Sequence, residues 1–122
     1  MAIGIFISYN HVDVRIATEL NNCLVALSES LRVFFDHASI SPGEDYETKI
    51  AASITSASWF IMINPGNPSV EKDMGWCFYE AGQFRNKLAA SGMTDKNITE
   101  RMCLIYDVSI PSQVSRFQAT KV

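Results

Sequence analysis

Short apolar runs alternate along this chain with segments in which apolar residues recur every three or four positions. The short runs are rich in β-branched and aromatic residues and end at polar ones, which predicts buried strands over Ile3–Ser8, Arg32–Asp36, Trp59–Asn64 and Met102–Asp107. The helical spacing between them predicts three amphipathic helices, whose apolar positions run over Ile16–Leu31, Ile50–Ala57 and Cys77–Leu88, with Asp13 as a cap of the first.

Strands that are apolar on both faces and alternate with helices indicate a parallel sheet covered by helices on each side. We therefore predict an α/β protein with a three-layer, flavodoxin-like, doubly wound sheet, in which the four strands lie in the order 2-1-3-4. Ligands of such sheets bind beyond the carboxyl ends of the strands, where the strand order reverses. Here that crevice lies after the first and third strands, at Ser8–His11 and Asn64–Gly66, with Asp36 beside it.

Glu80 is the charged residue whose position most needs an explanation. Cys77, Ala81, Phe84 and Leu88 form an apolar helical stripe, and Glu80 lies at its edge, about 40° from Phe84 on a helical wheel. Trp76 precedes Glu80 by four residues and shares its side of the helix. A half-buried carboxylate must be paired, have a raised pKa, or await a ligand, unless it merely borders the core.

Composition narrows the class of protein. The chain has 122 residues and no internal repeat, so we expect a single domain over residues 1–122, and 48% hydrophobic with 19% charged residues is typical of a globular protein. A net charge of −3 without clustered Lys or Arg argues against nucleic acid as a direct partner. No apolar run approaches the ~20 residues that cross a membrane.

The cysteines indicate the cellular compartment, and the histidines argue against a metal site. Cys23, Cys77 and Cys103 lack metal-ligand spacing and fall inside apolar patterns, so we expect buried thiols in a reducing compartment, the cytoplasm. His11 and His37 have no partner at ligand spacing, and we expect no metal.

Several common occupants of the crevice are excluded by the residues that follow the strands. Residues 8–13 contain no glycine, so neither a dinucleotide fingerprint nor a P-loop is present. A phosphoacceptor receiver domain would carry acidic residues after the first strand and an aspartate after the third, where this chain has Ser8-Tyr9 and Asn64. No Gly-x-Ser-x-Gly nucleophile elbow occurs.

The chain resembles a TIR domain of the bacterial, NAD-cleaving type. Three blocks carry the resemblance, in family order: Ile5-Phe6-Ile7-Ser8-Tyr9, then Val33-Phe34-Phe35-Asp36 with Ile40-Ser41-Pro42-Gly43, then Trp76-Cys77-Phe78-Tyr79-Glu80. The last is similar to the Trp-Cys-x-x-Glu segment of enzymatically active members. The resemblance runs from Ile3 to about Gln118.

The resemblance implies an NAD nucleosidase that cleaves the nicotinamide–ribose bond, with NAD as substrate and no cofactor. It implies that Glu80 is the catalytic residue and that the substrate is bound by Ser8, Tyr9, Asn10, Asp36, Pro42, Gly43 and Trp76. Structural alternatives stay open, because Ser8 can cap a turn, Asp36 can pair with Arg32, and Pro42-Gly43 can serve only as a bend. Linear ADP-ribose and a cyclic product are both compatible with the sequence.

The resemblance also implies activation by self-association with other TIR domains, in signal transduction or antiviral defence. TIR domains continue into a fifth strand and a last helix, so we expect this chain to be the N-terminal portion of a longer protein, with the fifth strand lacking or truncated and the fourth exposed as an edge. One alternative is a non-catalytic TIR adaptor, although adaptors commonly lack the glutamate. Another is an unrelated flavodoxin-like domain that binds a nucleotide without cleaving it.

Overall fold

A computed structural model describes residues 3–35, 46–64, 75–106 and 118–121 of the chain. It contains a parallel sheet with the strand order β2-β1-β3-β4-β5. The strands are β1 (Ile3–Tyr9), β2 (Leu31–Phe35), β3 (Trp59–Asn64), β4 (Met102–Tyr106) and β5 (Gln118–Lys121). The order reverses between β1 and β3, so the predicted doubly wound α/β fold is confirmed.

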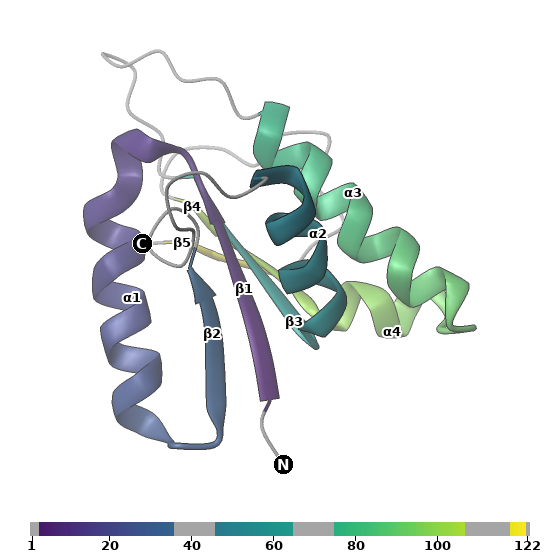
Figure 1. Cartoon of the computed structure of the whole chain (residues 1–122), viewed down its shortest axis with the longest axis horizontal. Coiled ribbons are helices and arrows are strands. Elements are labelled where there is room, and N and C mark those ends of the chain that lie inside the picture. Colours follow the sequence, from purple (N-terminus) through teal and green to yellow (C-terminus); the bar gives the residue numbers. More distant parts are fainter. Residues whose placement is uncertain (1–2, 36–45, 65–74, 107–117, 122) are drawn as a thin grey trace.

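Helices cover both faces of this sheet. Within the described residues, α1 (Val14–Leu27) lies on one face, after the short 3₁₀ turn η1 (His11–Asp13). The other face carries α2 (Tyr46–Ser56), α3 (Gly75–Ala90) and α4 (Asp95–Glu100), as Figure 1 shows. None of these helices is both long and apolar enough to cross a membrane.

Two apolar cores lie on the two faces, because successive side chains of a strand point to opposite sides. On the side of α2 and α3, the ring of Phe60 lies 5.7 Å from that of Phe6 and 5.5 Å from that of Phe84. On the side of α1, the core is formed by Ile5, Ile7, Tyr9, Ala17 and Ile63. Side chains at the even positions of β1 therefore face α3, which decides the surroundings of Ser8.

The fifth strand is present but has four residues, so it is truncated rather than lacking. It pairs in parallel with β4 from Cys103 to Tyr106. The expectation that the fourth strand is an exposed edge is therefore wrong, since β5 covers the hydrogen-bonding groups on that side.

Three local predictions need correction. The first helix ends at Leu27 and not at Leu31, because Ser28 is extended and Leu31 begins β2. Asp13 precedes α1 without a capping hydrogen bond from its side chain, whereas Asn10 accepts one from the amide of Val12 at 3.1 Å and caps η1. Cys23 is exposed, and of the three cysteines only Cys77 is buried.

Gly4 lies where the connection from α2 to β3 crosses the start of β1. Its carbonyl accepts a hydrogen bond from the amide of Ser58 at 2.8 Å. A Cβ atom at Gly4 would lie 2.6 Å from the carbonyl oxygen of Ser56 and 3.0 Å from Cα of Ala57. Both are backbone atoms, so this close approach requires glycine.

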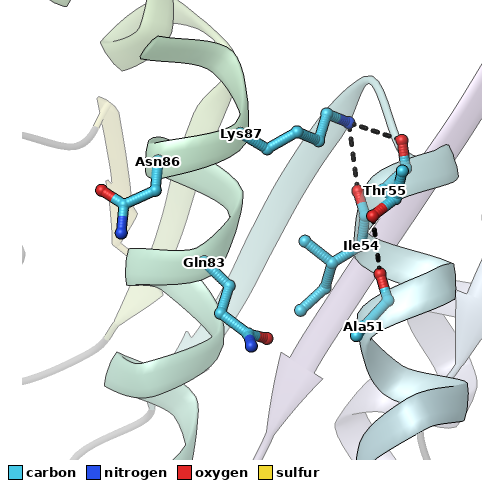
Figure 2. A pocket seen from close by; sticks show the side chains of 6 residues that line it. All are labelled: Ala51, Ile54, Thr55, Gln83, Asn86 and Lys87. Carbon is cyan, nitrogen blue, oxygen red and sulfur yellow. Dashed lines mark hydrogen bonds between the residues drawn. The ribbon is translucent and has the colours of Figure 1, made fainter. Parts of the chain in front are cut away.

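Lys87 joins α3 to the end of α2. Its ammonium donates hydrogen bonds to the carbonyl oxygens of Ile54 at 3.1 Å and Thr55 at 2.9 Å, which Figure 2 shows, and to the carbonyl oxygen of Ala57. The last carbonyls of a helix lack partners within the helix, and a cation there also complements the helix dipole. Lys87 is therefore a C-terminal cap of α2 supplied by another helix.

We expect Lys87→Met to lower the free energy of unfolding by about 1–2 kcal/mol, because the three carbonyl oxygens lose their charged donor while the apolar stem is kept. Urea denaturation followed by circular dichroism measures this change. Lys96→Met is the matched control, because Lys96 is an exposed residue of α4. Equal stability of the two variants would contradict the role of Lys87 as a cap.

The titration of Lys87 gives a second readout. Burial, and secondarily the positive charge of Arg101, lower the pKa of Lys87 below the ordinary lysine value. The folded chain therefore binds fewer protons at this site than the unfolded chain between the lowered pKa and the ordinary value. Over that pH window, wild type should gain stability relative to Lys87→Met as the pH rises.

Candidate functional site

Glu80 lies in the second turn of α3 and is completely buried, with 0% of its surface exposed. The helical wheel predicted a half-buried carboxylate, and this prediction is wrong. A helical wheel describes α3 alone. In the folded chain, β1 of the sheet also covers the edge of the apolar stripe, where Glu80 lies. The apolar residues of the stripe itself, Cys77, Ala81, Phe84 and Leu88, are buried as predicted.

Ser8 is the hydrogen-bond partner of this carboxylate. Its hydroxyl donates to Oε1 of Glu80 at 2.8 Å, across 72 residues of sequence, and Ser8 is also 0% exposed. Ser8 occupies the penultimate position of β1, on the face that turns toward α3. A hydroxyl bonded to a carboxylate inside the protein is a strong, charge-assisted interaction when the acid is ionised. Of the two sequence interpretations of Ser8, capping a turn and binding substrate, neither included this contact.

Trp76 lies one helical turn before Glu80 and is half-buried against the core of α2 and α3. Its indole stacks on the exposed ring of Tyr79, with centroids 5.1 Å apart and planes at 29°. The two rings form an aromatic pair near the N-terminal end of α3. Tyr79 directly precedes the buried Glu80 in the sequence. Such a pair offers a flat apolar surface.

Tyr9 and Asn10 are placed differently from Ser8. Tyr9 is 3% exposed and packs in the core on the α1 side, on the opposite face of the sheet from the residues that contact α3. Asn10 is half-buried and its side-chain oxygen caps η1. The structure therefore brings Ser8 of β1 into contact with Glu80 of α3, the helix that also carries Trp76. It places Tyr9 on the other side of the sheet.

Asp36, Pro42 and Gly43 lie outside the described residues, so their predicted roles stay predictions. Among the residues that are described, no three His, Cys, Asp or Glu side chains gather as metal ligands would. Two surface grooves occur in the same residues, one between α2 and α3 and one between β2 and α2. Glu80 lines neither of these two grooves.

The Ser8–Glu80 pair lies near the carboxyl ends of the two strands between which the order reverses. Tyr9 of β1 pairs with Ile63 of β3 one residue beyond Ser8, so the pair stands one residue from the end of the sheet. This is where doubly wound sheets bind ligands. A fixed carboxylate in a region of low dielectric can stabilise a positive charge that develops beside it.

Comparison with solved structures supports the fold. The TIR domains of the activated Roq1 resistosome, which directly recognises the pathogen effector XopQ, match with a TM-score of 0.64 and 16% identity, over 93% of this chain and 62% of that one. A prokaryotic SEFIR domain matches with a TM-score of 0.53 and 17% identity, over 96% of this chain and 80% of that one. The chain thus spans 62% of the length of the Roq1 chain.

Comparison with known sequences gives the family. No curated protein sequence matches the chain significantly. The sequence model of the TIR domain family matches residues 5–103, from β1 into β4, and includes both Ser8 and Glu80. Since this match spans most of the chain, the protein belongs to the TIR domain family.

Proposed function

We propose that this TIR domain is an NAD nucleosidase that cleaves the bond between nicotinamide and ribose. The observation that carries the proposal is a buried glutamate, Glu80, fixed by the hydroxyl of Ser8 near the strand ends of a TIR domain. The segment Trp76-Cys77-Phe78-Tyr79-Glu80 resembles the segment that holds the catalytic glutamate in active family members. Nicotinamide and either linear or cyclic ADP-ribose would be the products.

A single carboxylate suffices for this reaction. When the bond from C1′ of the ribose to the pyridinium nitrogen breaks, its electron pair goes to that nitrogen, and nicotinamide leaves as a neutral molecule. No proton has to be supplied to the leaving group, unlike in most sugar glycosidases. The ribose becomes oxocarbenium-like, and the anionic Glu80 stabilises this charge until water or an internal nucleophile adds to C1′. The adduct then releases a proton to the solvent.

Ser8 and Trp76 support this chemistry in different ways. Ser8 holds Oε1 of Glu80 and thereby orients the carboxylate, so we assign it a positioning role. Trp76, one turn away and stacked on Tyr79, offers an aromatic surface against which ribose or nicotinamide packs. Asn10, Asp36, Pro42 and Gly43 are retained in the proposal as substrate-binding residues. Tyr9 would act through the packing that supports Ser8, since its own side chain is buried on the α1 side.

The complete burial of Glu80 adds a requirement to the proposal. A substrate cannot touch a carboxylate with no exposed surface, so the site must open before NAD binds. We propose that self-association with other TIR domains supplies this opening, and the similarity in fold to TIR domains of an activated resistosome supports it. Turnover per molecule should therefore rise with protein concentration.

The test of this function is to incubate concentrated protein with NAD and to follow free nicotinamide by chromatography. We expect nicotinamide to appear together with ADP-ribose or its cyclic form. Light scattering reports whether the protein has assembled, and circular dichroism whether it is folded. NAD that stays intact with folded, assembled protein would overturn the enzyme proposal.

The second candidate is a non-catalytic adaptor that acts by association between TIR domains. The same burial of Glu80 favours it, because an inaccessible acid bonded to Ser8 can be a purely structural contact. An adaptor would assemble without consuming NAD. Its assembly would also be unaffected by replacements at Trp76, because the proposed role of Trp76 is to contact substrate.

We expect Ser8→Ala to lower both stability and turnover. The free energy of unfolding should fall by about 1–2 kcal/mol, because the buried carboxylate of Glu80 loses its hydrogen bond from Ser8. The rate of NAD cleavage should fall about tenfold or more, with KM little changed, since Glu80 is no longer held in place. Stability is measured by urea denaturation and turnover by nicotinamide release.

Ser8→Thr is the matched control, because it keeps the hydroxyl and adds one methyl group. Partial recovery of kcat in Ser8→Thr would separate positioning from simple loss of stability. A Ser8→Ala protein with unchanged kcat would contradict the positioning role and leave Ser8 as a structural residue.

A further inference from the structure

Two residues of α3 without a role in the proposed function, Tyr79 and Gln83, are linked to Trp76 by contacts along one side of the helix. Trp76, Tyr79 and Gln83 follow one another at spacings of three and four residues, so they lie on adjacent turns. The half-buried indole of Trp76 packs against the core on the α2 and α3 side of the sheet. The ring of Tyr79, which is 50% exposed, stacks on this indole. The indole is therefore restrained both by the core and by a ring at the surface.

The ring of Tyr79 has a restraint of its own. An exposed side chain samples several rotamers unless a contact selects one of them. The side-chain amide of Gln83 and the hydroxyl of Tyr79 form a hydrogen bond of 2.9 Å. A tyrosine hydroxyl both donates and accepts, so this bond forms with either the oxygen or the nitrogen of the amide. Gln83 thus holds the outer end of the ring, while the backbone of α3 holds its inner end.

We propose that Tyr79 and Gln83 are positioning residues for substrate binding. This inference rests on the proposed function, in which the indole of Trp76 packs against ribose or nicotinamide. A ring whose plane is fixed in advance binds a flat ligand more tightly, because less side-chain freedom is lost on binding. Tyr79, held by Gln83, fixes the plane of the indole, and neither residue has to touch the substrate.

This role affects KM rather than kcat. Tyr79→Leu removes the stacking ring and should raise KM for NAD about three- to tenfold, the range that one aromatic pair provides. The kcat should stay within about twofold of wild type, since Ser8 and Glu80 are unchanged. Tyr79→Phe and Gln83→Leu each remove only the hydrogen bond, and each should raise KM about two- to threefold.

A double variant tests whether the hydrogen bond is responsible. Because the bond needs both partners, Tyr79→Phe combined with Gln83→Leu should have the KM of either single variant. Gln83→Glu keeps an oxygen that accepts from the tyrosine hydroxyl and should keep the wild-type KM. Asn86→Leu, the matched control, removes an exposed amide on the other side of α3, as Figure 2 shows, and should also keep it. Additive effects of the two single variants, or an unchanged KM in Tyr79→Leu, would overturn the proposal.

A second measurement needs no substrate. The chain has two tryptophans, so Trp59→Phe leaves Trp76 as the only indole. Time-resolved fluorescence anisotropy in this background reports how freely the indole moves. The mobile fraction should rise in Tyr79→Leu, rise less in Gln83→Leu and stay unchanged in Asn86→Leu. Equal mobility in all of these proteins would overturn the positioning role, whether or not NAD is cleaved.

The two measurements separate the failure of this inference from the failure of the proposed function. If wild type cleaves NAD and the Tyr79 and Gln83 variants share its KM, only the positioning role is wrong. If folded and assembled wild type does not cleave NAD, the proposed function is wrong and the positioning role is lost with it.

Discussion

Glu80→Gln is expected to reduce NAD cleavage at least about 10³-fold, because the substitution removes the negative charge that stabilises the ribose cation. Glutamine has nearly the same volume and keeps a carbonyl oxygen that can accept the hydrogen bond from Ser8. The melting temperature should therefore stay within a few degrees of wild type. Nicotinamide release by assembled protein at saturating NAD measures kcat, and thermal unfolding measures stability.

The control for this prediction is Glu29→Gln, which removes an identical charge from an exposed position between α1 and β2. Its turnover should equal that of wild type. Product chromatography on the same samples separates ADP-ribose from its cyclic form. If Glu80→Gln assembles and cleaves NAD at the wild-type rate, Glu80 is a structural residue and the catalytic role is lost. If neither wild type nor Glu80→Gln cleaves NAD, the non-catalytic adaptor becomes the favoured function.

The second large effect concerns stability. Gly4→Ala is expected to lower the free energy of unfolding by about 2–4 kcal/mol, because the new methyl group would meet backbone atoms of Ser56 and Ala57 at 2.6 and 3.0 Å. Neither atom can move without shifting the connection between α2 and β3. For a chain of this length, such a loss lowers the melting temperature by about 10 °C. Urea denaturation and calorimetry measure it.

Gly82→Ala is the matched control for Gly4→Ala. Gly82 lies inside α3, and a Cβ atom there would meet nothing within 4 Å. The same chemical change should therefore stabilise the protein by up to about 1 kcal/mol, because alanine is the better helix former. Opposite signs for the two substitutions are the expected result. If Gly4→Ala leaves the free energy of unfolding unchanged, the backbone of Ser56 and Ala57 packs less closely on Gly4 than the structure shows.

The strands were predictable because their signal is local and strong. The apolar runs at Ile3–Ser8 and Trp59–Asn64 each coincide with an observed strand to within one residue. Helix α4 was missed for the opposite reason. Ile98 is the one apolar residue among Asp95–Glu100, so no periodicity arises, and the helix depends on burial of Ile98 and on capping by Thr94.

The candidate site was only partly visible in the sequence. Glu80 stood out because a carboxylate next to an apolar stripe is unusual, and the resemblance to TIR domains added a role. Its contact with Ser8 was not predictable, since the two residues are 72 positions apart. The alternation of β1 placed Ser8 on the face of Phe6, but only the docking of α3 shows which residue meets it. Lys87 gave no signal, because its hydrogen-bond partners lie at the end of another helix, α2.

The amino-acid sequence by itself determined the class of fold, the order of its strands and the helix that carries Glu80. These follow from apolar periodicity, which is a property of neighbouring residues. Only the tertiary structure decided that Glu80 is fully buried, that Ser8 binds it, that Tyr9 lies on the other face and that Lys87 caps a second helix. The physical reason is that burial and hydrogen bonding between distant segments depend on how helices pack on the sheet, which no local pattern specifies.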